Sequence, residues 1–107
     1  MSALPYDEHE ARRLLPLLKS IGREIAQRQR IVCRLELVEP PDDEREAHRE
    51  WVADLALQRR ELRMAHRELE RLGCSLVGRR PLTIRIPRRA PEGRRSFLWQ
   101  GGELLPY

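Results

Sequence analysis

The sequence contains no asparagine, only one lysine among its 21 basic residues, and aromatic side chains at only 5% of positions. It lacks any run of about 18 uncharged apolar residues, which excludes a transmembrane helix. The first residues show neither the basic nor the apolar region of a secretory signal, so we expect a cytoplasmic protein with no membrane partner. Charged residues occupy 36% of positions and hydrophobic residues 40%. This composition favours long amphipathic helices with broad solvated faces and excludes a β-sandwich or a doubly wound sheet.

Charge is distributed unevenly along the chain. Residues 1–72 carry 14 basic and 15 acidic residues, whereas residues 73–107 carry seven arginines and two glutamates. The net charge of +4 therefore comes from the last third of the chain. Such a segment is expected to attract phosphates, acidic proteins or an anionic surface. A GC-rich genome also favours arginine over lysine, so the choice of arginine does not by itself indicate phosphate recognition.

Apolar residues recur every three or four positions between residues 7 and 37, which predicts a first long helix. Asp7, with Glu10 three residues later, has the pattern of an N-terminal capping box. Pro16 lies inside the helix and removes one backbone hydrogen bond, so we expect a kinked but continuous helix. The repeating positions are Ala11, Leu14, Leu18, Ile21, Ile25, Arg28, Val32 and Leu35.

A second helix is predicted from about residue 43 to residue 72. Pro40 and Pro41 end the first helix, and either Asp42 or Asp43 is available to cap the second. Gly73 supplies the C-terminal stop. Two long helices joined by a short connection predict an antiparallel helical hairpin. The repeating positions of the second helix are Trp51, Leu55, Gln58, Leu62, Ala65, Leu69 and Leu72.

Folding the chain back at Pro40 brings the two apolar stripes together. Leu18 then lies opposite Leu62, and Arg28 lies opposite Trp51. The layer of Arg28 and Trp51 is either a cation–π contact that fixes the register or an arginine that extends to solvent. The helical interface predicted in this way consists of Leu14, Leu18, Ile21, Ile25, Trp51, Leu55, Leu62 and Leu69.

Further apolar residues lie outside this interface and widen the apolar face beyond what a lone hairpin can cover. Either the C-terminal segment or a second copy of the chain must pack there. A two-fold dimer that forms a four-helix bundle is the simplest solution. The residues concerned are Leu15, Leu17, Ile31, Val52, Leu57 and Met64.

The periodicity changes after Ser75. Leu82, Ile84 and Ile86 alternate with polar residues, which predicts a short strand, and residues 96–99 predict a second one. We expect a β-hairpin laid against one end of the helices. The fold class is therefore α+β, mostly α, in a single domain (1–107) made of a helical hairpin (1–72) and a basic β segment (73–107). The last seven residues form either an ordered extension or a tail.

The sequence contains no catalytic or metal-binding constellation. His9, His48 and His66 have no ligand partner at the spacing of a zinc site, so neither a metal site nor a cofactor is predicted. Cys33 and Cys74 belong at opposite ends of the hairpin, too far apart for a disulfide bond, so we expect two reduced thiols. No nucleophile motif or phosphate loop occurs. We therefore predict no enzymatic activity.

Seven arginines and two aromatic residues gather in the last third of the chain. Arginines of this kind can contact phosphates while an aromatic ring stacks on a base. In the alternative interpretation, Phe97 and Trp99 belong to the core, and the arginines pair with the chain's own acidic helix faces or with an acidic protein. The residues predicted to bind phosphate or a partner are Arg79, Arg80, Arg85, Arg88, Arg89, Arg94, Arg95 and Trp99.

Three segments of the chain together resemble a known family. Residues 6–16 carry an aromatic residue, a cap, Glu-Ala and Leu-Leu-Pro; residues 72–73 end the second helix with Leu-Gly; and residues 98–103 are similar to a Cys-Trp-x-x-Gly-Glu block. In this order they resemble the bacterial and archaeal family catalogued as domain of unknown function twenty-two-oh-three. The resemblance implies two helices followed by a β segment, and it implies no particular activity.

The chain also departs from the pattern of that family. Leucine replaces the family's cysteine at position 98, Arg-Ile-Pro at 85–87 stands where the family has Asp-Phe-Pro, and the sequence reaches Tyr107 without the family's Trp-His. The resemblance therefore implies a divergent member whose polar site is lost or altered.

Two functions fit these observations. The first is a non-enzymatic protein that acts by self-association or protein–protein interaction through its helical hairpin, most simply as a homodimer. The second is an accessory factor that binds nucleic acid or the ribosome through the C-terminal arginines.

Overall fold

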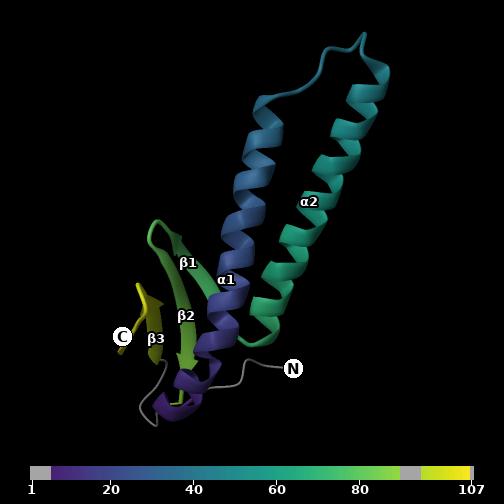
Figure 1. Cartoon of the computed structure of the whole chain (residues 1–107). Coiled ribbons are helices and arrows are strands. Elements are labelled where there is room, and N and C mark those ends of the chain that lie inside the picture. Colours follow the sequence, from purple (N-terminus) through teal and green to yellow (C-terminus); the bar gives the residue numbers. More distant parts are fainter. Residues whose placement is uncertain (1–5, 90–94, 107) are drawn as a thin grey trace.

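The computed structural model describes residues 6–89 and 95–106. Two long helices, α1 (Glu8–Leu37) and α2 (Arg45–Arg71), run antiparallel and are followed by a small sheet, which confirms the predicted α+β, mostly α fold class. The molecule measures 62 × 29 × 21 Å, because the helices extend well beyond the sheet (Figure 1). Neither of the described helices is long and apolar enough to cross a membrane.

The start of α1 follows the predicted capping box. The Asp7 carboxylate accepts a hydrogen bond from the backbone N–H of Glu10 at 2.7 Å, and the Glu10 carboxylate accepts one from the N–H of Asp7 at 3.0 Å. The hydrogen bond from the backbone N–H lowers the pKa of Asp7, because it favours the ionised carboxylate. Pro16 lies within α1 without ending it, which confirms a continuous helix.

The start of α2 differs from the prediction. Neither Asp42 nor Asp43 caps the helix; the cap position is Glu44, whose side chain makes no capping hydrogen bond. The reason is a turn in which the N–H of Glu44 donates to the carbonyl of Pro41 at 3.1 Å, so that both aspartates lie inside the turn. At the other end, Gly73 adopts a φ of 75° and stops α2 as predicted.

The register between the helices also differs from the prediction. The Arg28 guanidinium donates to the side chain of Gln58 at 2.9 Å, and the Trp51 indole N–H donates to the carbonyl of Leu35 at 2.7 Å. The predicted contact of Arg28 with Trp51 is therefore wrong. Arg28 contacts the residue one heptad after Trp51, and Trp51 contacts the residue one heptad after Arg28. Registers that differ by a heptad present the same apolar pattern, so the pattern cannot distinguish them.

The C-terminal segment forms a four-stranded antiparallel sheet and not a two-stranded hairpin. Its order is β1 (Ser75–Arg79), β2 (Leu82–Arg88), β3 (Arg95–Gln100) and β4 (Glu103–Pro106). The two predicted strands are β2 and β3, which pair with each other. β1 was missed because Ser-Leu-Val-Gly-Arg shows no clear alternation of apolar and polar residues, and β4 orders residues 103–106 of the segment that the sequence left open as extension or tail; Tyr107 lies outside the described residues.

α1 lies between α2 and the sheet (Figure 1). The inner face of the sheet packs against α1, and no side chain intervenes at Gly22, where Leu82 approaches the helix backbone. The alternative interpretation of the two C-terminal aromatic residues as core is confirmed, since both are buried there. The buried cluster consists of Ala11, Leu18, Ile21, Ile25, Ala65, Leu69, Cys74, Ile84, Ile86, Phe97 and Trp99.

Tyr6 joins three distant segments at the base of the molecule. Its backbone N–H donates to the carbonyl of Pro87 at 2.9 Å, and its carbonyl accepts from the N–H of Arg89 at 2.8 Å. Its hydroxyl donates to the carbonyl of Leu72 at 2.8 Å. Burial raises the pKa of this phenol. The residue therefore fixes the end of β2 and the end of α2 to the start of α1.

Candidate functional site: an arginine groove beside α1

The structure separates the arginines that the sequence places in one cluster. Arg85 lies on the solvent-facing side of β2, because its neighbours Ile84 and Ile86 are buried on the inner side. Arg88 covers the aromatic ring of Phe97, with 5.2 Å between its guanidinium carbon and the ring centroid. These two arginines therefore point away from one another and do not form a shared phosphate site.

Three further predicted residues are also placed elsewhere. Arg89 forms an ion pair with Glu10 at 3.4 Å, as the alternative of internal charge pairing predicts. Trp99 is only 8% exposed and belongs to the buried cluster, so its ring is not available to stack on a base as predicted. Arg95 begins β3 opposite Arg88. Arg94 lies outside the described residues.

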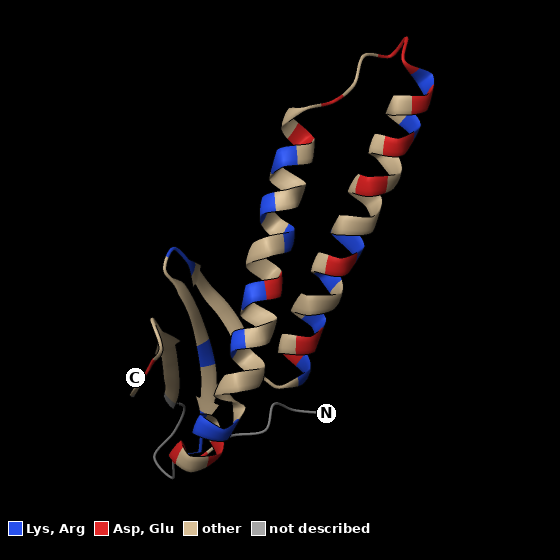
Figure 2. Ribbon diagram, in the orientation of Figure 1, with Lys and Arg blue, Asp and Glu red and all other residues tan. Residues whose placement is uncertain are grey.

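Arg79 and Arg80 have a different environment, in the turn between β1 and β2. This turn, coloured blue in Figure 2, stands beside the middle of α1. A pocket of about 650 Å³ lies between the two elements. It is lined from α1 by Ile25, Ala26, Gln29, Arg30 and Cys33, and from the sheet by Leu76, Arg79, Arg80 and Leu82.

A second hollow continues the pocket around α1. The two share Ala26, Arg30 and Leu82, so they form one surface, which we call the arginine groove. Neither part is lined by an aspartate or a glutamate. The second hollow adds Gly22, Arg23, Gln27, Ile31 and Arg34. The groove therefore combines an apolar floor with five arginines from two elements, namely Arg23, Arg30, Arg34, Arg79 and Arg80.

The charge of the groove is not neutralised by the rest of the described chain. All five arginines are exposed, and none takes part in an ion pair found among residues 6–89 and 95–106. Arginines elsewhere do have carboxylate partners, such as Arg12 with Glu8 at 3.2 Å. A positive surface next to an apolar floor is suited to an anionic ligand that also carries apolar groups.

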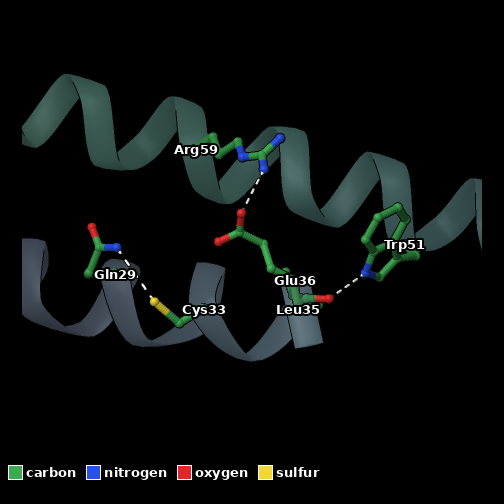
Figure 3. A network of polar contacts seen from close by, with 6 residues as sticks. All are labelled: Gln29, Cys33, Leu35, Glu36, Trp51 and Arg59. Carbon is green, nitrogen blue, oxygen red and sulfur yellow. Dashed lines mark hydrogen bonds and ion pairs between the residues drawn. The ribbon is translucent and has the colours of Figure 1, made fainter. Parts of the chain in front are cut away.

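Three polar contacts lie in and near the groove: one is within α1 and two join α1 to α2 (Figure 3). The amide of Gln29 donates to the thiol sulfur of Cys33 at 3.6 Å, so two groove residues fix each other. On the α2 side, Arg59 donates to Glu36 at 3.1 Å. This contact and the hydrogen bond from the Trp51 indole to the carbonyl of Leu35 together connect the last turns of α1 to α2.

The predicted helical interface is used within the chain. Its larger part is buried, including Leu18, Ile21, Ile25, Leu55 and Leu69. Its remaining members, Leu14, Trp51 and Leu62, are half-buried. These side chains hold α1, α2 and the sheet together, so they are not free to contact a second copy. Outside this interface, the exposed apolar residues on the helices include Leu17, Val52, Leu57 and Met64.

The two thiols lie in different environments. Cys33 is exposed and Cys74 is buried, and both are free cysteines. Burial raises the pKa of the Cys74 thiol to about 11, which keeps it protonated at neutral pH. Within the described residues, no group of three or more histidines, cysteines or carboxylates is arranged to hold a metal ion.

No family model, curated protein or solved structure matches this chain.

Proposed function

We propose that this protein is a non-enzymatic binding protein that takes an acidic segment of a protein partner into the arginine groove. The observation that carries the proposal is the lining of the groove, in which five exposed arginines and no carboxylate surround an apolar floor. Carboxylates of the partner would pair with the guanidinium groups, which suit planar bidentate recognition. Apolar side chains of the partner would cover the half-buried Ala26, Leu76 and Leu82.

The aromatic residues favour a protein ligand over a single-stranded nucleic acid. Single-strand binding depends on exposed rings on which bases stack. Among the described aromatic residues, Phe97 and Trp99 are buried, and Tyr6 and Trp51 are half-buried with their polar atoms hydrogen-bonded inside the chain. The groove therefore offers charge and apolar surface but no stacking platform.

The remaining expectations from the sequence belong to this proposal. We place the protein in the cytoplasm, where its two free cysteines stay reduced. The proposal includes self-association, in which the protein partner is a second copy of the chain and the complex is a homodimer. The resemblance to the twenty-two-oh-three family remains part of the proposal, supported by the two helices and the β segment that follow in the expected order.

Fluorescence anisotropy tests the groove directly. The probe is a fluorescein-labelled 12-residue peptide of alternating glutamate and leucine pairs. The variant Arg79→Glu/Arg80→Glu is expected to weaken its binding by at least about tenfold, since two of the five groove arginines are then replaced by glutamates that repel the carboxylates of the peptide. Arg63→Glu/Arg67→Glu is the matched control, because it changes the same number of charges on the exposed surface of α2.

The same assay separates the alternatives. The proposal is wrong if the control variant loses binding to the same extent, because attraction would then depend on net charge alone. It is also wrong if a single-stranded oligonucleotide binds the wild-type chain at 150 mM salt, a concentration at which the peptide does not bind.

A further inference from the structure

The connection between the two helices carries the opposite charge to the arginine groove. Residues 37–44, which we call the tip segment, contain Glu39, Asp42, Asp43 and Glu44 and no basic residue. Two apolar side chains precede these carboxylates, Leu37 at 84% exposure and Val38 at 61%. Figure 2 shows the acidic tip segment at the far end of the hairpin from the sheet.

The tip segment therefore matches the ligand that the groove favours. It offers carboxylates for the guanidinium groups and two bulky apolar side chains for the floor. Its carboxylates are accessible: the Asp42 side chain is fully exposed, and the imidazole of His48 lies 4.0 Å from its carboxylate. Exposed leucine and valine side chains next to this acidic loop gain from being covered by another surface.

The placement of the two surfaces permits a reciprocal contact between two copies. Arg30 in the groove and Leu37 at the tip are seven residues apart on the same helix, which is about 10 Å along its axis. Because α1 is a continuous helix, it holds the tip segment away from the groove of its own chain. Two copies that overlap only at the ends of their hairpins, antiparallel and related by a two-fold axis, place each tip segment at the other groove.

Building on the function proposed above, we propose that the partner held in the groove is the tip segment of a second copy, in a two-fold dimer with two identical contacts. Such an interface closes on itself and leaves the two sheets at opposite ends of the assembly. Two molecules with a long axis of 62 Å then form a particle about 100 Å long. A four-helix bundle with the hairpins side by side would instead stay close to the length of one copy.

A charge-exchange experiment on the full chain tests this dimer. The groove variant is Arg79→Glu/Arg80→Glu, and the tip variant is Asp42→Lys/Asp43→Lys. Each variant alone is expected to lose self-association, with a Kd raised on the order of 100-fold, because in both contacts the substituted side chains face groups of their own charge: glutamates face the acidic tip segment, or lysines face the arginine groove. An equimolar mixture is expected to restore a dimer that contains one chain of each kind, since the introduced glutamates then face the introduced lysines in one contact and the other contact is that of the wild type.

The readouts are mass from light scattering, composition from native mass spectrometry and particle length from small-angle scattering. Circular dichroism confirms that each variant is folded, and Arg63→Glu/Arg67→Glu controls for a general effect of charge. A mixed dimer with a length of about 100 Å supports the proposal. A mixture that stays monomeric overturns it, as does a wild-type dimer that both charge variants leave intact.

The peptide assay keeps this inference distinct from the function on which it rests. A wild-type chain that is monomeric but binds the acidic peptide overturns the reciprocal dimer and leaves the groove as a site for another acidic protein. A chain that neither dimerises nor binds the peptide overturns both.

Discussion

Because Gly22 and Leu82 lie so close together, the substitution Gly22→Ala is expected to destabilise the wild-type chain but to stabilise a variant that has alanine at position 82. A Cβ atom at position 22 would lie 2.6 Å from Cδ2 of Leu82 and 3.6 Å from Cδ1 of Ile84. Since carbon atoms pack at about 3.5–4.0 Å, the Leu82 side chain must move by about 1 Å to accept Gly22→Ala. Overpacking of this kind costs about 1–3 kcal/mol. Alanine also has a higher helix propensity than glycine, which stabilises the folded chain by about 1 kcal/mol.

Gly22→Ala is therefore expected to lower the free energy of unfolding by about 0–2 kcal/mol in the wild-type chain. In a Leu82→Ala background the clash is absent, and the same substitution is expected to raise that free energy by about 1 kcal/mol. The assay is urea unfolding followed by helical circular dichroism, with all four proteins of the double-mutant cycle compared at a common m-value. Destabilisation of equal size in both backgrounds would refute the close approach of helix and strand as its cause.

Three further predictions concern side chains inside the fold. Trp51→Phe removes the indole hydrogen bond to the Leu35 carbonyl, so it is expected to lower the free energy of unfolding by about 0.5–1.5 kcal/mol with unchanged helix content. Ellman's reagent is expected to modify one thiol, Cys33, rapidly in the native protein and Cys74 only after unfolding. Because the folded state raises the pKa of Cys74 from 9.0 to about 11, it retains a proton that the unfolded state loses. The free energy of unfolding is therefore expected to fall as pH rises through this interval. Urea midpoints measured against pH are expected to fall less for Cys74→Val than for the wild-type chain. An identical dependence on pH in the two proteins would contradict the attribution to Cys74.

The helices are predictable because their signals are local. The spacing of apolar residues specifies both elements, the pair of Asp7 and Glu10 marks the start of α1, and Gly73 marks the end of α2. The start of α2 was misplaced because either aspartate after the two prolines could cap a helix. Only the folded turn, closed on the carbonyl of Pro41, shows that both precede it.

The sheet was predictable in part. β2 and β3 follow from their alternation, whereas β1 carries little apolar alternation and contains a bulge. A signal for β4 was present: Gly101 and Gly102 both adopt positive φ values, 58° and 85°, in the turn before it. Adjacent glycines between apolar segments are a hairpin signal, and Leu104 and Leu105 follow them directly.

The candidate site was predicted only at Arg79 and Arg80. Charge counted by segment draws attention to the last third of the chain, although the groove takes its other three arginines from α1. The missing signal is their spacing, since Arg23, Arg30 and Arg34 lie seven and four residues apart and therefore on one face of a helix. That this face meets the β1–β2 turn depends on how the sheet packs, which no local pattern in the sequence reveals.

The three hydrogen bonds of Tyr6 have a consequence for how the chain opens. They connect the start of α1 with the end of α2, 66 residues away, and with the end of β2. Because the sheet and the last turn of α2 depend on the same residue, their amide hydrogens are expected to exchange with solvent through one shared opening event. Hydrogen exchange is therefore expected to report the whole base of the molecule as one cooperative unit.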